Sequence, residues 1–284
     1  MKAMKLMQSE YRGWLFHSRM ILLPCVFIMI YTMITANFMK CAGQMQAPIN
    51  IVEPFVGVCN SPTFLGFIPI VFLVLIADFP RIDQNMIFKI CRAGRKKWIV
   101  SQLLFLLCAD LSFVVLLFVG VTLPVLKQGF LYNGWSDVVT EMLKTFPELK
   151  NSSLAQFIPA NLYYQMLPYR AVLYSAGFLI LYLYLLGLLM LLCKIHGRGA
   201  LGVVVSGGLV IAGSGFVHLQ KIAIKWLFPA AHGIVQTHYS TYYRRMDCTL
   251  QTSFLYFALL IGICILAALR YAKKIDYIDI VQME

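Results

Sequence analysis

Charged side chains are scarce in this chain: Asp, Glu, Lys and Arg make up 13% of its 284 residues, and only 12 residues are acidic. Soluble domains carry about 25% charged residues. Because 60% of the residues are hydrophobic and the mean hydropathy is +0.77, the composition excludes an ordinary soluble enzyme or binding domain. The chain is predicted to be an integral membrane protein.

Several chemical motifs are also missing. The sequence has no G-x-x-x-x-G-K-[ST] phosphate-binding loop, no H-E-x-x-H and no C-x-x-C. We therefore expect no catalytic residues, no metal site and no cofactor in this chain. An intramembrane enzyme assembled from distant segments is kept as a minor alternative. Cys41, Cys59 and Cys248 fall on one predicted side of the membrane, where either a disulfide or simple packing would account for them.

Long apolar runs define the expected architecture. A hydrocarbon core of roughly 30 Å needs about 20 apolar residues per helix. Runs of this kind predict an all-α membrane protein in which residues 1–284 form a single domain with six spans. These spans are expected at 20–38, 56–77, 98–123, 171–193, 200–217 and 254–269. The second run contains Pro62 and Pro69, so an interruption near one of them is expected.

Basic residues set the predicted orientation. Most of the 24 Lys and Arg residues fall in the N-terminal segment, in the connections after the second and fourth spans, and after the sixth span. The positive-inside rule then places both termini in the cytoplasm and the protein in the cytoplasmic membrane as a multi-pass protein. The net charge of +12 is dispersed among loops beside lipid, and this pattern argues against nucleic acid as a partner.

Three segments outside the spans show helical periodicity or helix breakers. Residues 1–19 carry apolar side chains at helical spacing among basic ones, which predicts an interfacial helix. The outer loop 127–168 contains an amphipathic helix, whose apolar stripe runs from Trp135 to Phe146. Residues 222–234 are too short to cross a membrane and contain Pro229 and Gly233, so they are expected to form a re-entrant or interfacial segment.

The cytoplasmic connection 80–94 is the most informative of these segments. Pro80 suits the first turn of a helix and Gly94 suits the residue after its end. Apolar residues recur on one face of this helix: Ile82, Met86, Ile87 and Ile90. That face would fit either a groove on a partner protein or the surface of the bilayer.

Asp110 lies near the middle of the third predicted span. A charged carboxylate there costs roughly 2.5 to 3.5 kcal/mol. It is therefore a candidate for the transport pathway, or it accepts a structural hydrogen bond from Tyr174, Tyr182 or Ser206. The fifth span contains Gly202, Gly207, Gly208, Gly213 and Gly215, for which close helix packing is the expected explanation.

Taken together, the N-terminal helix, the six spans, the basic connection and the outer segments resemble a permease subunit of the ABC-2 superfamily, the type V exporters. The run from Phe79 to Arg81, followed by the run from Arg92 to Trp98, is similar to the sequence with which such permeases enter their third span. The resemblance implies that the connection is a coupling helix that docks on a cytosolic P-loop ATPase. The docking residues would be Arg81, Ile82, Met86, Ile87, Lys89 and Ile90.

The same resemblance implies a second permease copy or a related permease, with ATP and Mg²⁺ bound by the partner ATPase and not by this chain. The expected function is export of an amphiphilic or peptide-like substrate. An ion-coupled secondary transporter that uses Asp110 is the alternative, although the sequence shows no evident repeat between its halves.

Overall fold

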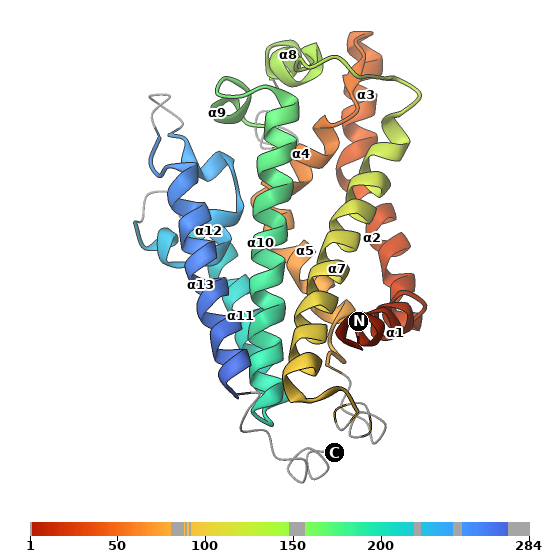
Figure 1. Ribbon diagram of the computed structural model, residues 1–284. Coiled ribbons are helices and arrows are strands. Elements are labelled where there is room, and N and C mark those ends of the chain that lie inside the picture. Colours follow the sequence, from red (N-terminus) through yellow and green to blue (C-terminus); the bar gives the residue numbers. More distant parts are fainter. Residues whose placement is uncertain are drawn as a thin grey trace.

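The computed structural model describes residues 2–80, 88, 90, 92–147, 157–218, 223–240 and 246–271. Long helices run side by side and form an elongated bundle (Figure 1). We call its two ends the α1 end and the α8 end, after the short helices that lie there. The all-α class is confirmed in this part of the chain, apart from one parallel pair of two-residue strands, β1 (Ile49–Asn50) and β2 (Gly129–Phe130).

Five continuous helical stretches are long and apolar enough to cross a membrane. The first joins α2 (Leu22–Ile30), a π-helical turn at Tyr31–Thr35 and α3 (Ala36–Met45). The others are α7 (Arg95–Thr122), α10 (Pro168–Ile195), α11 (Gly199–His218) and α13 (Leu250–Tyr271). Their exposed faces are apolar, as lipid contact requires, and the chain is accordingly a multi-pass membrane protein.

A sixth span depends on a bent pair, α4 (Glu53–Asn60) and α5 (Pro62–Leu75), whose axes meet at 87°. Pro62 lacks an N–H group and disfavours the helical conformation of the residue before it, and Ser61 is indeed extended. The expected interruption therefore occurs at Pro62, whereas α5 continues through Pro69. Every residue of α4 is buried, so this half-helix is surrounded by protein along its whole length.

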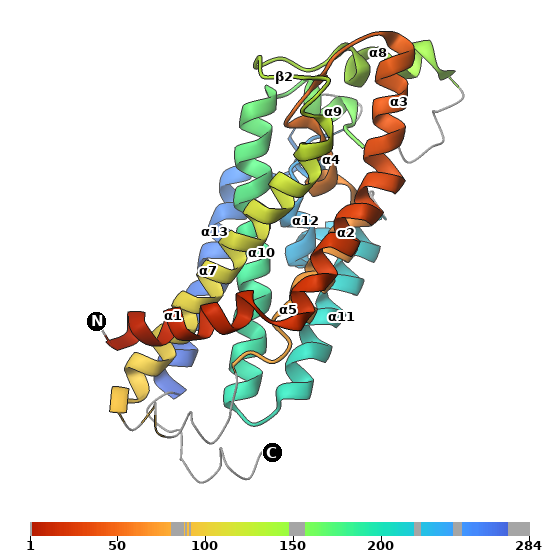
Figure 2. The same cartoon turned by 90° about the vertical axis from the view of Figure 1, so that its right-hand side faces the viewer.

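Shorter elements cover both ends of the bundle. Figures 1 and 2 show α1 (Lys2–Leu15) lying across the bundle at the end opposite α8 (Asp137–Thr145). The α8 helix is the amphipathic helix expected in the outer loop, and it buries Val138 and Met142. Beside it lies α9 (Ala160–Tyr163).

The segment between α11 and α13 folds inward. It consists of the 3₁₀ turn η5 (Ala223–Leu227), α12 (Pro229–Gly233) and a second 3₁₀ turn, η6 (Gln236–His238). All five residues of α12 are buried. None of these elements is long enough to cross a membrane. Ile222, the first residue of the predicted re-entrant segment, lies outside the described residues.

Two glycines of α11 permit close packing. A Cβ atom on Gly213 would lie 2.6 Å from the Cβ atom of Ala230 in α12, and one on Gly202 would lie 3.0 Å from that of Cys193 in α10. The packing expected for the glycines of this span is confirmed at these two positions. Gly207, Gly208 and Gly215 have nothing within 4 Å of an added Cβ atom.

Candidate functional site

Of the predicted docking residues, only Ile90 lies within the described part of the chain. Arg81, Ile82, Met86, Ile87 and Lys89 lie outside it. The side chain of Ile90 is 1% exposed and belongs to the hydrophobic core. Ile90 thus packs against its own chain in this structure, and its side chain is not presented to a partner.

Phe88 is an exposed apolar residue of this connection, with 74% of its surface accessible. Phe88, Ile90, Arg92 and Ala93 are helical. Residues two positions apart point to nearly opposite faces of a helix, which explains why Phe88 is exposed while Ile90 is buried. Gly94 then adopts φ +88°, a conformation that favours glycine, and α7 begins at the next residue.

The other end of the connection is held by Asp78. Its carboxylate accepts a hydrogen bond from Arg19 Nη2 at 2.8 Å, and its backbone carbonyl accepts one from Lys194 Nζ at 3.0 Å. Arg19 belongs to the turn between α1 and α2, and Lys194 to the last turn of α10. Asp78 therefore joins three elements directly before the connection starts.

The α1 helix is fastened to the bundle by polar contacts. Gln102 Nε2 donates to both carboxylate oxygens of Glu10, at 2.8 and 3.0 Å, and Trp14 Nε1 donates to the carbonyl oxygen of Leu75 at 3.0 Å. Trp14 is also 7% exposed and packs edge-on against Phe105. These contacts tie α1 to both α5 and α7.

Asp110 is fully buried within α7. Neither of its carboxylate oxygens has a hydrogen-bond partner among the residues that the structure describes. The hydroxyl of Ser206 donates instead to the carbonyl oxygen of Leu186, and the buried hydroxyl of Tyr182 is itself without a partner there. Within the part of the chain that the structure describes, the expected hydrogen bond from Tyr174, Tyr182 or Ser206 is not formed, and the carboxyl group of Asp110 is an unpaired polar group in an apolar span.

Asn60 is the centre of a buried hydrogen-bond network at the bend between α4 and α5. Its Oδ1 accepts from the backbone N–H groups of Val235 at 3.0 Å and Gln236 at 3.2 Å. Its Nδ2 donates to the Val56 carbonyl at 2.8 Å and to Ser175 Oγ at 2.7 Å. The bend is thereby tied to α10 and to the segment between α11 and α13.

Glu53 organises the α8 end in a similar way. Its Oε1 accepts from the backbone N–H of Ser136 at 2.6 Å, and its Oε2 accepts from Ser136 Oγ at 2.7 Å and from the backbone N–H of Asn50 at 3.2 Å. Ser136 is the N-cap of α8. One buried carboxyl group therefore joins the start of α4, the strand β1 and the start of α8.

Glu53→Gln is expected to destabilise the protein by about 1 to 3 kcal/mol, although it preserves the shape of the side chain. Whichever way the amide is turned, its NH₂ group faces one of the two backbone N–H groups, of Ser136 or of Asn50. One of these two buried donors then loses its acceptor. The measurement is the free energy of unfolding in detergent micelles.

Glu141→Gln is the matched control on the same side of the protein. Glu141 pairs with Lys144 at 2.8 Å, but both side chains are largely exposed. Loss of such a pair costs less than about 1 kcal/mol. Equal effects of the two substitutions would show that Glu53 is not the organising contact.

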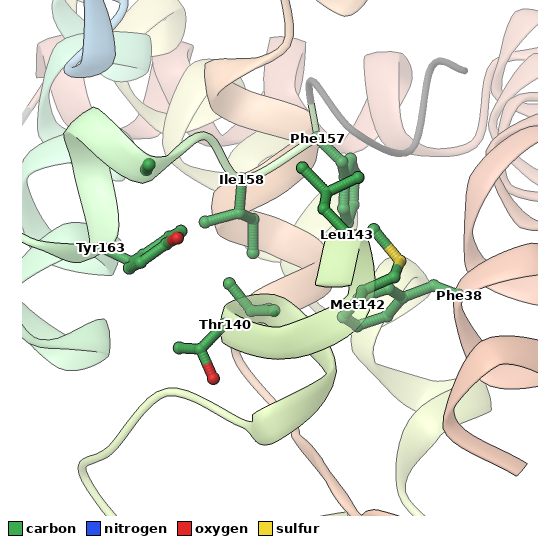
Figure 3. A pocket seen from close by; sticks show the side chains of 9 residues that line it. Phe38, Thr140, Met142, Leu143, Phe157, Ile158 and Tyr163 are labelled. Carbon is green, nitrogen blue, oxygen red and sulfur yellow. The ribbon is translucent and has the colours of Figure 1, made fainter. Parts of the chain in front are cut away.

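A small pocket lies beneath α8. Its volume is about 60 Å³, and it is lined mainly by apolar side chains of α8, α3 and residues 157–163. Figure 3 shows Leu143, Phe157 and Met142 gathered on one side of this pocket and Tyr163 on the other. Sites that enclose a small molecule have volumes of roughly 300 to 1,000 Å³. This pocket is accordingly too small to hold an amphiphilic cargo.

Only weak patterns in the sequence pointed to the residues that organise these contacts. Asn60 precedes Ser61 and Pro62 inside an apolar run, and a polar residue at a helix break has backbone groups to satisfy. Glu53 precedes Pro54, a combination typical of a helix start. Phe88 carried no such signal, because it is one of several apolar residues in its segment. Comparisons with protein-family models, with curated proteins and with solved structures gave no match.

Proposed function

We propose that this chain is the membrane-spanning permease subunit of an ATP-binding-cassette exporter of the ABC-2 type, driven by an ATPase on a separate chain. The observation that carries the proposal is the connection between α5 and α7. It presents the exposed Phe88, while the chain on either side is firmly anchored. Asp78 precedes it and binds two other elements, and the buried Trp98 follows it at the start of α7.

Anchoring on both sides suits a connection that transmits the movement of a docked ATPase to the helices. A docked ATPase that displaces the connection would pull on α5 and α7 directly. Through Asp78 it would also act on the turn before α2 and on the end of α10. Packed helices joined by short contacts move as units, so a displacement at the α1 end reaches the rest of the bundle. In this proposal the α1 end and both termini face the cytoplasm, and α4 with α5 forms the second of six spans.

The transport pathway is proposed to lie between two permeases. The pocket of about 60 Å³ at the α8 end is too small for an amphiphilic cargo, whereas α11 exposes large apolar side chains such as Val204 and Ile211. A second copy or a related permease would complete a larger cavity between the subunits. An apolar pathway of this kind favours an amphiphilic or peptide-like cargo.

The decisive experiment is affinity purification of the tagged protein from its native membranes in mild detergent, followed by identification of the proteins that accompany it. A P-loop ATPase in equimolar amount, with Mg²⁺-dependent ATP hydrolysis in the purified complex, is the expected result. A preparation free of any ATPase, from membranes in which transport is active, would refute the proposal.

Asp110 supports a second candidate function, that of an ion-coupled secondary transporter. A fully buried carboxyl group with no partner among the described residues is a group that binds and releases a proton in many such proteins. In this alternative the connection 80–94 rests on the bilayer, and a proton gradient supplies the energy.

Asp110→Asn separates the two functions. If Asp110 carries the proton, transport by the Asp110→Asn variant falls at least about tenfold and no longer depends on the proton gradient. The reason is that an amide side chain does not bind and release a proton as a carboxyl group does. If the ATPase drives transport, activity in membrane vesicles follows ATP and survives a protonophore. Asp137→Asn, on the exposed surface of α8, is the control, and its transport should equal that of the wild type.

A further inference from the structure

Two buried histidines converge on one serine between α12 and α13. His232 in α12 is 5% exposed, and His238 in η6 and Ser253 in α13 are both fully buried. The distances to Ser253 Oγ are 2.7 Å from His232 Nδ1 and 2.7 Å from His238 Nε2. Residues from three separate elements therefore place two imidazole nitrogens around a single point.

The opposite nitrogens of both rings contact backbone carbonyl groups. His232 Nε2 lies 2.8 Å from the carbonyl oxygen of Trp226, and His238 Nδ1 lies 2.8 Å from that of Ile234. A carbonyl oxygen can only accept, so these two nitrogens carry the ring hydrogens. In the neutral rings, His232 Nδ1 and His238 Nε2 therefore direct lone pairs toward Ser253.

This arrangement has one acceptor too many. The Ser253 hydroxyl has a single proton, which can satisfy only one of the two lone pairs. Pairing of Ser253 with a general base would likewise use only one histidine. A metal ion placed between the two rings would accept both lone pairs.

Cys248 supplies a third donor of the appropriate kind. Its Sγ lies 4.0 Å from Ser253 Oγ, and the ligand atoms of His232, His238 and Cys248 all lie within 4.8 Å of one another. Imidazole and thiolate are ligands that Zn²⁺ prefers, at about 2.0 to 2.3 Å, which puts tetrahedral ligand atoms about 3.3 to 3.8 Å apart. Small side-chain movements would bring these three atoms to that spacing.

The surroundings fix both rings as a metal site requires. His238 stacks on Phe178 with an interplanar angle of 9°, and His232 stacks on Tyr256 at 20°. Histidine ligands in metal sites donate their second N–H to a carboxylate or a backbone carbonyl, which orients the ring. Lys225 is buried over the ring of Trp226, whose carbonyl group contacts His232, and a Cys248 thiolate would offset the positive charge of this lysine beside the cation.

We infer that His232, His238 and Cys248 bind a Zn²⁺ ion that fastens the inward-folded segment 223–240 to the start of α13. The two imidazoles contribute neutral lone pairs, and the Cys248 thiol releases its proton to solvent as the thiolate binds. The fourth position is left to water or to Ser253 Oγ. Motifs such as H-E-x-x-H and C-x-x-C do not find this site, because its ligands lie on different short elements.

The test uses the full-length protein in detergent, treated with a chelator and then titrated with Zn²⁺ alone. One Zn²⁺ per chain is expected, and it should raise the midpoint of thermal unfolding in a manner that a chelator reverses. Replacement by Co²⁺ should produce a thiolate-to-cobalt charge-transfer band. Cys248→Ser should abolish that band and weaken Zn²⁺ binding at least about tenfold, while His232→Gln should weaken binding similarly.

Cys25→Ser, on an exposed position of α2, and His196→Gln, at the α1 end, are the matched controls and should bind Zn²⁺ as the wild type does. If the wild type takes up no Zn²⁺, or if Cys248→Ser and His232→Gln bind it unchanged, the inference is overturned. The Cys248 variant keeps the test independent of folding, because this side chain is only partly buried.

Discussion

Replacing Phe88 by alanine is expected, under the proposed function, to release the ATPase and to stop ATP-driven transport, while this chain itself still folds. Phe88 is 74% exposed, so its removal leaves no cavity within this chain. An aromatic side chain that fills a groove on a partner contributes about 2 kcal/mol or more, which corresponds to about a 30-fold change in Kd. The measurement is the amount of ATPase that co-purifies, together with transport in vesicles.

Phe16→Ala is the matched control, since Phe16 is 85% exposed at the same end of the bundle but lies between α1 and α2. It should leave the complex intact. Ile90→Ala should behave differently from both, because the loss of a buried side chain lowers the free energy of unfolding by about 2 to 5 kcal/mol. If Phe88→Ala retains both the ATPase and transport, the docking role assigned to this connection is wrong.

Asn60→Leu is expected to destabilise the protein by about 2 to 6 kcal/mol. Leucine is close in size to asparagine, but it removes the acceptor of two buried backbone N–H groups, those of Val235 and Gln236. Each buried donor left without a partner costs about 1 to 3 kcal/mol. Unfolding in mixed micelles gives the magnitude, and proteolysis within residues 223–240 should increase because this segment loses its attachment to the bend.

Asn37→Leu makes the same substitution on an exposed face of α3, where the amide donates to the carbonyl oxygen of Met33 in its own helical stretch. This substitution should change the free energy of unfolding by no more than about 1 kcal/mol. If Asn60→Leu lowers the free energy of unfolding no more than Asn37→Leu does, the hydrogen-bond network at the bend contributes little to stability.

The membrane class and the helices could be predicted because both follow from local features of the chain. A helix satisfies its own backbone hydrogen bonds, and lipid demands an apolar surface, so runs such as 171–193 identify α10 without any knowledge of its neighbours. Pro62 and Gly94 interrupt helices through properties of their own backbone, so these breaks are also local features. The angle of 87° at Pro62 cannot be predicted locally, because the packing around α4 determines it.

The partners of the polar side chains could not be predicted from the sequence. Asn60 is 175 residues away from Val235, and Glu53 is 83 residues away from Ser136. An apolar run indicates that a polar residue within it needs a partner, but not which distant group will provide one.

The sequence by itself therefore determined a helical membrane protein, the positions of its long apolar helices and a helix break near Pro62 or Pro69, because backbone hydrogen bonding and lipid contact act on neighbouring residues. Only the tertiary structure decided that Ile90 is buried while Phe88 is exposed, that Asp110 has no partner among the described residues, and that His232, His238 and Cys248 meet. These features depend on how separate helices pack together, and one chain admits many packings with the same apolar pattern.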